Sequence, residues 1–400
     1  MIISKRNFVD YTLLLMVIAI SGIPYFTTSL LYIPVTAVLL ISFLLRKNSF
    51  DKEFIFLLIA LTIVTVMQTY EFSFFSMQSI IGVYLRVVIG YLIVKLLNDK
   101  FTHYYINILY YFAVIGIIFF ILTLLSPMVS LFKSLLPVFS IFNIANSVHE
   151  TLIVYNISHM DSFRNSGPFW EPGAFGGYLI LAIIFLYFQK NIYNQKRKLI
   201  VLVVALLSTF STTGFLALAI FLFFYYYKDI QNVILKILLG TLILYGAYFS
   251  YHNLDFLGKK LEYQLAMAKN ANAYGKDANT QRFLNTLRDI EDFKGHELFG
   301  RGSNPLTRYA YKHEEQIRTV GLTDVIVRNG FLFFLLMIYF MYKSVCAIVS
   351  NAKNKKSKLF CYGSMITILT SLMSEVYFNF PLYWSLLFIF LVSNQQEEKY

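Results

Sequence analysis

Arg164 and Glu171 lie in FRNSGPFWEPGAFGG (163–177), a polar, turn-rich segment between long apolar runs. An arginine binds phosphate oxygens through its planar guanidinium, and a carboxylate can act as a general base. Pro172 directly after Glu171 predicts that a helix begins there, because proline suits the first helical position. Glu171 is therefore either an ordinary helix-start carboxylate or a catalytic group that orients Arg164 or accepts a proton.

Charged residues elsewhere in the chain indicate the same chemistry. Arg86 lies in the apolar run SIIGVYLRVVIGYLIVKLL, about two helical turns from its outer end. An unpaired charge there costs at least ~2.5 kcal/mol. Arg86 and Glu375, which lies in SLMSEVYFNFP, either reach the membrane interface or line a polar cavity. The other candidates fall between residues 277 and 328, and they are Arg282, Arg288, His313, Arg318, Asp324 and Arg328.

These residue types predict a site for a phosphate-bearing substrate. Clustered arginines match phosphate geometry, and the nearby carboxylates and His313 are candidate bases. The glycines of LFGRGSN form a loop that can bring backbone amides to an anion. The sequence contains no Walker loop, hydrolase triad or metal-ligand spacing. We therefore expect neither a metal ion nor a cofactor.

The elements that must position these residues are membrane helices. Hydrophobic residues make up 58% of the chain and charged residues only 14%, against about 25% in soluble domains. We expect an all-α polytopic membrane protein, one integral domain over residues 1–400, because apolar runs of spanning length recur. About twelve spans are predicted, at 8–24, 28–45, 54–70, 79–97, 104–125, 174–189, 198–211, 213–228, 230–249, 322–345, 359–376 and 381–394.

The basic residues predict how the chain is oriented. Lysine and arginine gather in alternate short loops, so the positive-inside rule places those loops and both termini in the cytoplasm. Two long loops, 126–173 and 250–321, then face outward. The net charge of +12 is explained by the basic loops rather than by nucleic-acid binding. The two cysteines are too few for a disulfide framework.

Two local patterns predict structure near the outer face. The run 199–227 is too long for one span, and Ser211-Thr212-Thr213-Gly214 in its middle predicts a tight turn between two short helices. Phe283, Leu287, Ile290 and Phe293 recur at helical spacing. They predict an amphipathic helix that lies on the membrane or on the protein.

The sequence resembles the O-antigen polymerase and ligase superfamily, the Wzy-type proteins. The similar features are RNSGPFWEPGAFGG entering a span, STTG between two short helices, QRF followed by LFGRG, and DVIVRNG opening a late span. The resemblance implies a fold similar to that of membrane-class, lipid-dependent glycosyltransferases. It also implies a polysaccharide repeat-unit polymerase at the outer face of the bacterial cytoplasmic membrane.

The implied substrate is an oligosaccharide linked to undecaprenyl pyrophosphate, held in the membrane lipid. A chain-length regulator is a candidate partner. By the resemblance, Arg164 and Arg318 bind the pyrophosphate, supported by Arg282 and Arg86, while Glu171, Asp324 and His313 are candidate bases.

The sequence departs from the family in two places. Family polymerases often have ten residues between an arginine and a glycine in each long loop. Here eleven residues separate Arg164 from Gly176 and Arg318 from Gly330. Ligases usually carry a histidine where this chain has Thr319, which favours a polymerase over a ligase. The alternatives are a ligase that moves finished glycan to another lipid, and a lipid-linked sugar flippase or solute transporter.

Overall fold

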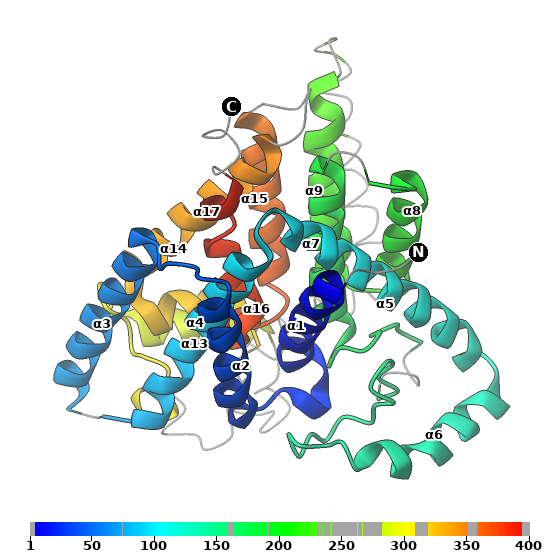
Figure 1. Ribbon diagram of the computed structural model, residues 1–400, viewed down its shortest axis with the longest axis horizontal. Helices are drawn as coiled ribbons and strands as arrows, with labels where there is room; N and C mark the ends of the chain where they lie inside the picture. The colour runs from blue at the N-terminus through cyan, green and yellow to red at the C-terminus, as the bar shows by residue number, and fades with distance from the viewer. Residues whose placement is uncertain are drawn as a thin grey trace.

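The computed structural model is helical throughout the part of the chain that it describes (Figure 1). It describes residues 5–73, 75–158, 163–189, 192–229, 282–308, 319–350 and 358–393, and the single residues 232, 234, 241, 262 and 266. Within these residues, the one β-type pairing is an isolated bridge between Thr151 and Asn156. The all-α prediction is confirmed for this part of the chain.

The helices divide into long ones and short connecting ones. The α-helices are α1 Lys5–Gly22, α2 Tyr32–Leu45, α3 Lys52–Phe72, α4 Met77–Leu97, α5 Phe101–Thr123, α6 Ser126–Ser140, α7 Pro172–Phe188, α8 Gln195–Ser208, α9 Thr212–Asp229, α13 Arg282–Phe293, α14 Gly321–Ser350, α15 Lys358–Leu372, α16 Pro381–Trp384 and α17 Phe390–Ser393. The short 3-10 helices are η1 Pro24–Phe26, η2 Ser29–Leu31, η3 Asn98–Lys100, η5 Pro305–Thr307, η7 Tyr377–Asn379 and η8 Ser385–Leu387.

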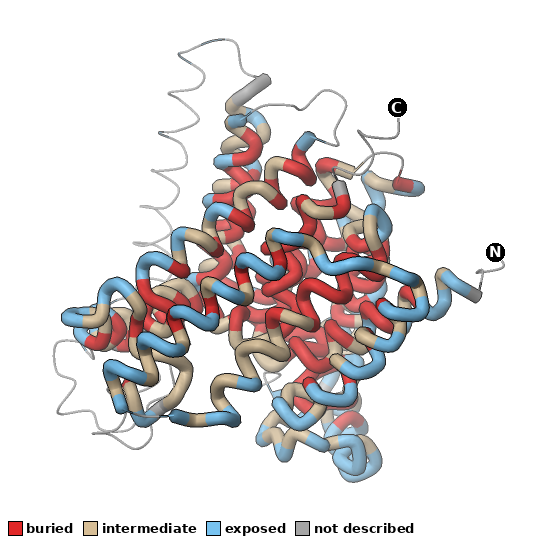
Figure 2. Tube along the Cα trace, turned by 60° about the vertical axis from the view of Figure 1, so that its left-hand side comes forward, coloured by how far each residue is buried: buried red, intermediate tan, exposed pale blue. Residues whose placement is uncertain are grey.

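Helix α7 is the centre of the bundle. Its residues are apolar on every side and all except Tyr187 are buried, because α5, α8, α9 and α15 pack around it. Figure 2 shows the buried residues concentrated in the middle and the exposed ones on the peripheral helices. A side chain at Gly177 would put its Cβ 2.0 Å from the Tyr377 hydroxyl, so glycine there permits the close approach of η7 to α7.

The helix lengths fit a helical membrane protein. Three described helical stretches are long and apolar enough to cross a membrane: Lys52–Phe72, Met77–Thr123 and Gly321–Ser350. Five shorter apolar helices accompany them, including Pro172–Phe188 and Thr212–Tyr227. Twelve full spans are not established, and the predicted span 230–249 falls almost entirely outside the described residues.

The chain differs from the predicted layout at two described places. The predicted outer loop 126–173 contains helix α6, whose buried Phe132 packs in a small cluster with Leu152, Tyr155 and Ile157. The predicted last span, 381–394, is broken into α16, η8 and α17. These short helices are buried against α4 and α14, so their apolar residues serve packing rather than a continuous spanning helix.

Helix α13 confirms the predicted amphipathic pattern, but its polar face is the one that packs on the protein. Asn285, Asp289 and Asp292 are buried, whereas Leu287 is 40% exposed and Ile290 50% exposed. Buried carboxylates need paired cations, and Arg308 supplies one to both aspartates. The exposed apolar face is the arrangement expected of a helix that lies at a lipid interface.

Helix α14 is interrupted at Gly330, which adopts φ +72° and ψ 169°. The break lets residues 297–302 pair with the helix backbone: the Arg301 amide donates to Val327 O (2.8 Å) and the Phe331 amide donates to Glu297 O (2.7 Å). Gly300, at φ +70°, lies against the break. The motifs LFGRG and VRNG therefore form one interlocked turn.

Replacing Gly330 with alanine is expected to destabilise the protein strongly. This backbone conformation is essentially restricted to glycine and costs a residue with a side chain about 1–3 kcal/mol. The new Cβ would also lie 2.3 Å from Leu298 O. Gly295→Ala is the matched control, because Gly295 has φ +80° but open space around it. Thermal unfolding in detergent should show a large loss for Gly330→Ala and a small one for Gly295→Ala; equal losses would contradict the interlocked turn.

Candidate functional site

Arg308 is the centre of a buried charge cluster at the start of α14. Its guanidinium lies 3.0 Å from Asp289 Oδ1, 3.3 Å from Asp292 Oδ2 and 3.1 Å from Asp324 Oδ1. Burial alone would lower the pKa of Arg308, but the carboxylates, Asp324 first, raise it above its usual value. Arg308 therefore stays charged and joins α13 to α14.

Asp324 extends this cluster toward the bundle. Its second oxygen, Oδ2, lies 2.9 Å from Arg328 Nε, one helical turn further along α14. These ion pairs of Asp324 are close charge contacts without hydrogen-bond alignment. Arg328 also donates a hydrogen bond to Asn379 Oδ1 in η7. Asp324 is thus occupied by two arginines, which suits a positioning carboxylate better than a general base.

Arg86 differs from Arg308 and Arg328 in its partners. Among the described residues, its guanidinium donates from Nε to Gly82 O (2.8 Å) and has no carboxylate within ion-pair distance. It interacts electrostatically with Tyr32, Arg328 and Asp324. The Tyr32 hydroxyl in turn donates to Asn379 O (3.3 Å). Arg86 is therefore a half-buried cation next to the Arg328 group, without a neutralising partner of its own in the described structure.

Arg164, in the segment that precedes α7, lies against the turn between α8 and α9. Its Nε donates to Thr209 O (3.1 Å), and the adjacent Asn165 binds Ser208 through both its backbone amide (3.0 Å) and its side chain (2.9 Å). A tight turn joins the two helices as predicted, but it lies at 209–211, and Thr212, Thr213 and Gly214 form the start of α9. Thr209 and Ser211 in this turn are buried, while Phe210 is 48% exposed. The segment RNSG and the turn after α8 are therefore a single structural unit.

Glu171 begins α7, as the sequence predicts. It is the N-cap residue in an extended conformation, Pro172 follows at the first helical position, and its carboxylate makes no capping bond. The neighbouring Trp170 donates from Nε1 to Glu375 Oε2 (3.3 Å) and lies near the Phe380 ring, with centroids 4.8 Å apart. Trp170 thus connects the start of α7 to the segment after α15.

Residues 375–379 join the two groups of candidates. A side chain at Gly321 would meet Glu375 O at 2.0 Å, so α14 begins directly against Glu375. The Tyr377 hydroxyl donates to Gly173 O (2.9 Å) in the first turn of α7. Through Asn379, the same segment contacts Arg328 and Tyr32. Arg86, Glu171, Asp324, Arg328 and Glu375 therefore belong to one continuous region at one end of the bundle.

The structure leaves part of the predicted site without description. Arg318 and His313 lie outside the described residues, and Arg282 is located only by its place at the start of α13. Arg288 is half-buried on α13. No group of three or more potential metal ligands occurs among the described residues. Asp289, Asp292 and Arg308 are functional candidates that the sequence did not predict, although the spacing of the two aspartates on one helix face was a usable signal.

The fold and this site define a class: a helical protein of membrane type with a cluster of arginines and carboxylates where helices begin and turn. A scan against protein-family models found no match, and a search of curated proteins found no similar sequence.

Proposed function

We propose that this protein is a glycosyltransferase that polymerises polysaccharide repeat units at the outer face of a bacterial cytoplasmic membrane. The substrate is a glycan linked to undecaprenyl pyrophosphate. The observation that carries the proposal is Arg86, a cation without a carboxylate partner in the described structure, held beside Arg328 and the start of α14. A half-buried arginine without a carboxylate partner is costly within a membrane helix unless an anion pairs with it.

The proposed glycosyl transfer depends on lipid pyrophosphate being a good leaving group. A hydroxyl of the acceptor sugar attacks the anomeric carbon of the donor, a new C–O bond forms, and the bond to the lipid pyrophosphate breaks. The pyrophosphate leaves with the electron pair of that bond, and arginines stabilise the charge that develops on it. The hydroxyl proton passes to a base. Glu171 suits this role best, because it is partly exposed, makes no capping bond and lies outside the Arg308 cluster.

The proposal is tested by deleting the gene in the source organism and restoring it as wild type, Arg164→Ala or Arg197→Ala. Arg197 is an exposed residue on α8 and serves as the matched control. We expect deletion to reduce a ladder of surface glycan to single repeat units. Wild type and Arg197→Ala should restore the ladder, while Arg164→Ala should lose roughly 10²-fold of polymer formation, as removal of one charge-stabilising donor does.

Two other outcomes would overturn the proposal. Loss of all surface glycan with long lipid-linked chains outside the cell would identify a ligase. Accumulation of single lipid-linked units inside the cell would identify a transporter. An Arg164→Ala protein that polymerises as well as wild type would remove Arg164 from the site.

A further inference from the structure

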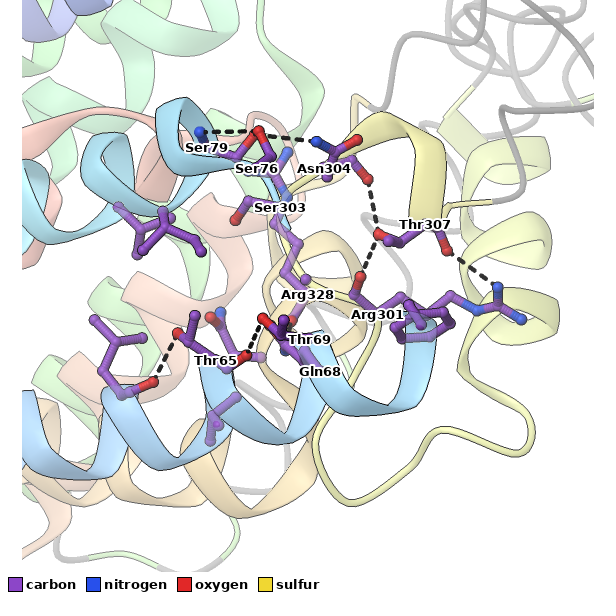
Figure 3. Close-up of a pocket in the computed structure, with 17 residues that line it drawn as sticks. Thr65, Gln68, Thr69, Ser76, Ser79, Arg301, Ser303, Asn304, Thr307 and Arg328 are labelled. Atoms are coloured by element: carbon purple, nitrogen blue, oxygen red, sulfur yellow. Dashed lines mark hydrogen bonds between the residues drawn. The ribbon is translucent and has the colours of Figure 1, made fainter. Parts of the chain in front are cut away.

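A pocket opens between the end of α3, the start of α4, residues 301–307 and the break in α14 (Figure 3). It contains about 560 Å³ of empty space, which includes space open to solvent. The polar residues at its wall include Thr65, Gln68 and Thr69 from α3 and Arg328 from α14. Phe72 and Val83 contribute an apolar wall.

The hydrogen-bond donors of the α3 residues are already used within the protein. The Thr65 hydroxyl donates to Leu61 O and the Thr69 hydroxyl to Thr65 O, each at 2.8 Å. Gln68 Nε2 donates to Phe299 O (2.6 Å) and to Arg328 O (2.7 Å). The two carbonyls fix the orientation of the amide, because only the NH₂ group can face both. Two hydroxyl oxygens and Gln68 Oε1 remain as acceptors.

The two arginines at the pocket use part of their donor capacity on protein partners, and each keeps further guanidinium N–H groups. Arg301 donates from Nε to Asp292 O (2.6 Å) and from its terminal nitrogen to Thr307 O (3.1 Å). Arg328 pairs with Asp324 and Asn379. Asn329 uses its NH₂ group on Val325 O (2.9 Å), which leaves its Oδ1 as a further acceptor. No described carboxylate belongs to the pocket wall.

We propose that this pocket binds a neutral sugar ring, one unit of the glycan substrate. The wall combines these acceptors with the remaining guanidinium N–H donors, and sugar hydroxyls can donate to the former and accept from the latter. A carboxylate or a phosphodiester has no donor and would leave the acceptors unpaired. An ammonium group would meet two arginines and no carboxylate. The C–H face of a sugar ring fits the apolar wall of Phe72 and Val83. The role of this sugar in polymerisation rests on the proposed function, whereas its binding does not.

The test measures binding directly on the full-length protein in lipid nanodiscs. Saturation-transfer NMR is recorded with the methyl glycosides of glucose, galactose, rhamnose and N-acetylglucosamine, each at millimolar concentration. Wild type is compared with Thr65→Val/Thr69→Val, which removes two acceptors at nearly constant side-chain volume. The matched control is Thr36→Val, because Thr36 makes the same type of hydrogen bond, to Tyr32 O at 2.6 Å, on a helix outside the pocket.

We expect at least one glycoside to bind wild type and Thr36→Val, and to bind the double variant about tenfold more weakly, as the loss of two ordinary hydrogen bonds implies. Sodium phosphate should not compete with it. Competition by phosphate, absence of binding by every glycoside, or equal binding to a folded double variant would overturn the assignment. If a glycoside binds as expected while the glycan ladder is unaffected by gene deletion, the pocket assignment stands and the polymerase proposal fails.

Discussion

An Arg308→Met protein is expected to be the least stable single variant of the charge cluster. The substitution keeps an apolar stem of similar length but removes the cation that Asp289, Asp292 and Asp324 share, although Asp324 keeps its contact with Arg328. Removing one partner of a buried charge pair typically costs about 3–5 kcal/mol. Thermal unfolding followed by size-exclusion chromatography in detergent should therefore show early loss of the folded peak.

Two further variants test whether the loss of stability comes from the buried carboxylates left around position 308. Lys294→Met removes a cation from an exposed site just beyond α13 and should leave the unfolding temperature nearly unchanged. Adding Asp289→Asn and Asp292→Asn to Arg308→Met should recover part of the lost stability, because fewer uncompensated carboxylates remain. An Arg308→Met protein that unfolds at the wild-type temperature would contradict the buried cluster.

An Arg86→Gln protein is expected to lose activity without losing stability. Polymer formation should fall by roughly 10²–10³-fold, because a group that stabilises the leaving pyrophosphate is removed. Stability should be unchanged or increased, since Arg86 has no carboxylate partner in the described structure and costs free energy where it lies. Polymer formation by Arg86→Lys should lie between that of wild type and that of Arg86→Gln, because lysine keeps the charge but lacks the planar guanidinium.

These effects are measured by the glycan ladder and by the same unfolding assay. Lys133→Gln is the control, since Lys133 is an exposed cation on α6. A fully active Arg86→Gln protein would remove Arg86 from the proposed site. A variant that fails to fold would show that Arg86 has a structural role like that of Arg308.

The features predicted correctly from the sequence depend on short-range rules. Glu171-Pro172 predicts a helix start because proline has a fixed backbone angle, and α7 begins there. The turn before Thr212 follows from small polar residues that interrupt an apolar run. The α13 helix follows from its spacing of apolar residues.

The features that sequence reasoning missed depend on partners far away in the chain. Nothing near Arg308 in the sequence indicates that it would meet Asp289 and Asp324. The spacing of apolar residues in α13 does not show which face packs inward, because a face with carboxylates can be buried when a cationic side chain pairs with them. The segment 381–394 is apolar enough to predict a span, but burial against α4 and α14 allows it to break into short helices.

The Arg308 cluster has a consequence for how the protein is made. Its members enter the growing chain in the order Asp289, Asp292, Arg308 and finally Asp324, because synthesis runs from the amino terminus. Until α14 emerges, Arg308 has only the two α13 carboxylates available, and Asp324 reaches the membrane last. The cost of placing Asp324 at the head of an apolar helix is thus met by Arg308, which is already present. Docking of α14 onto α13 can therefore begin before residues 375–379, which contact Arg328 and the start of α14, have been made.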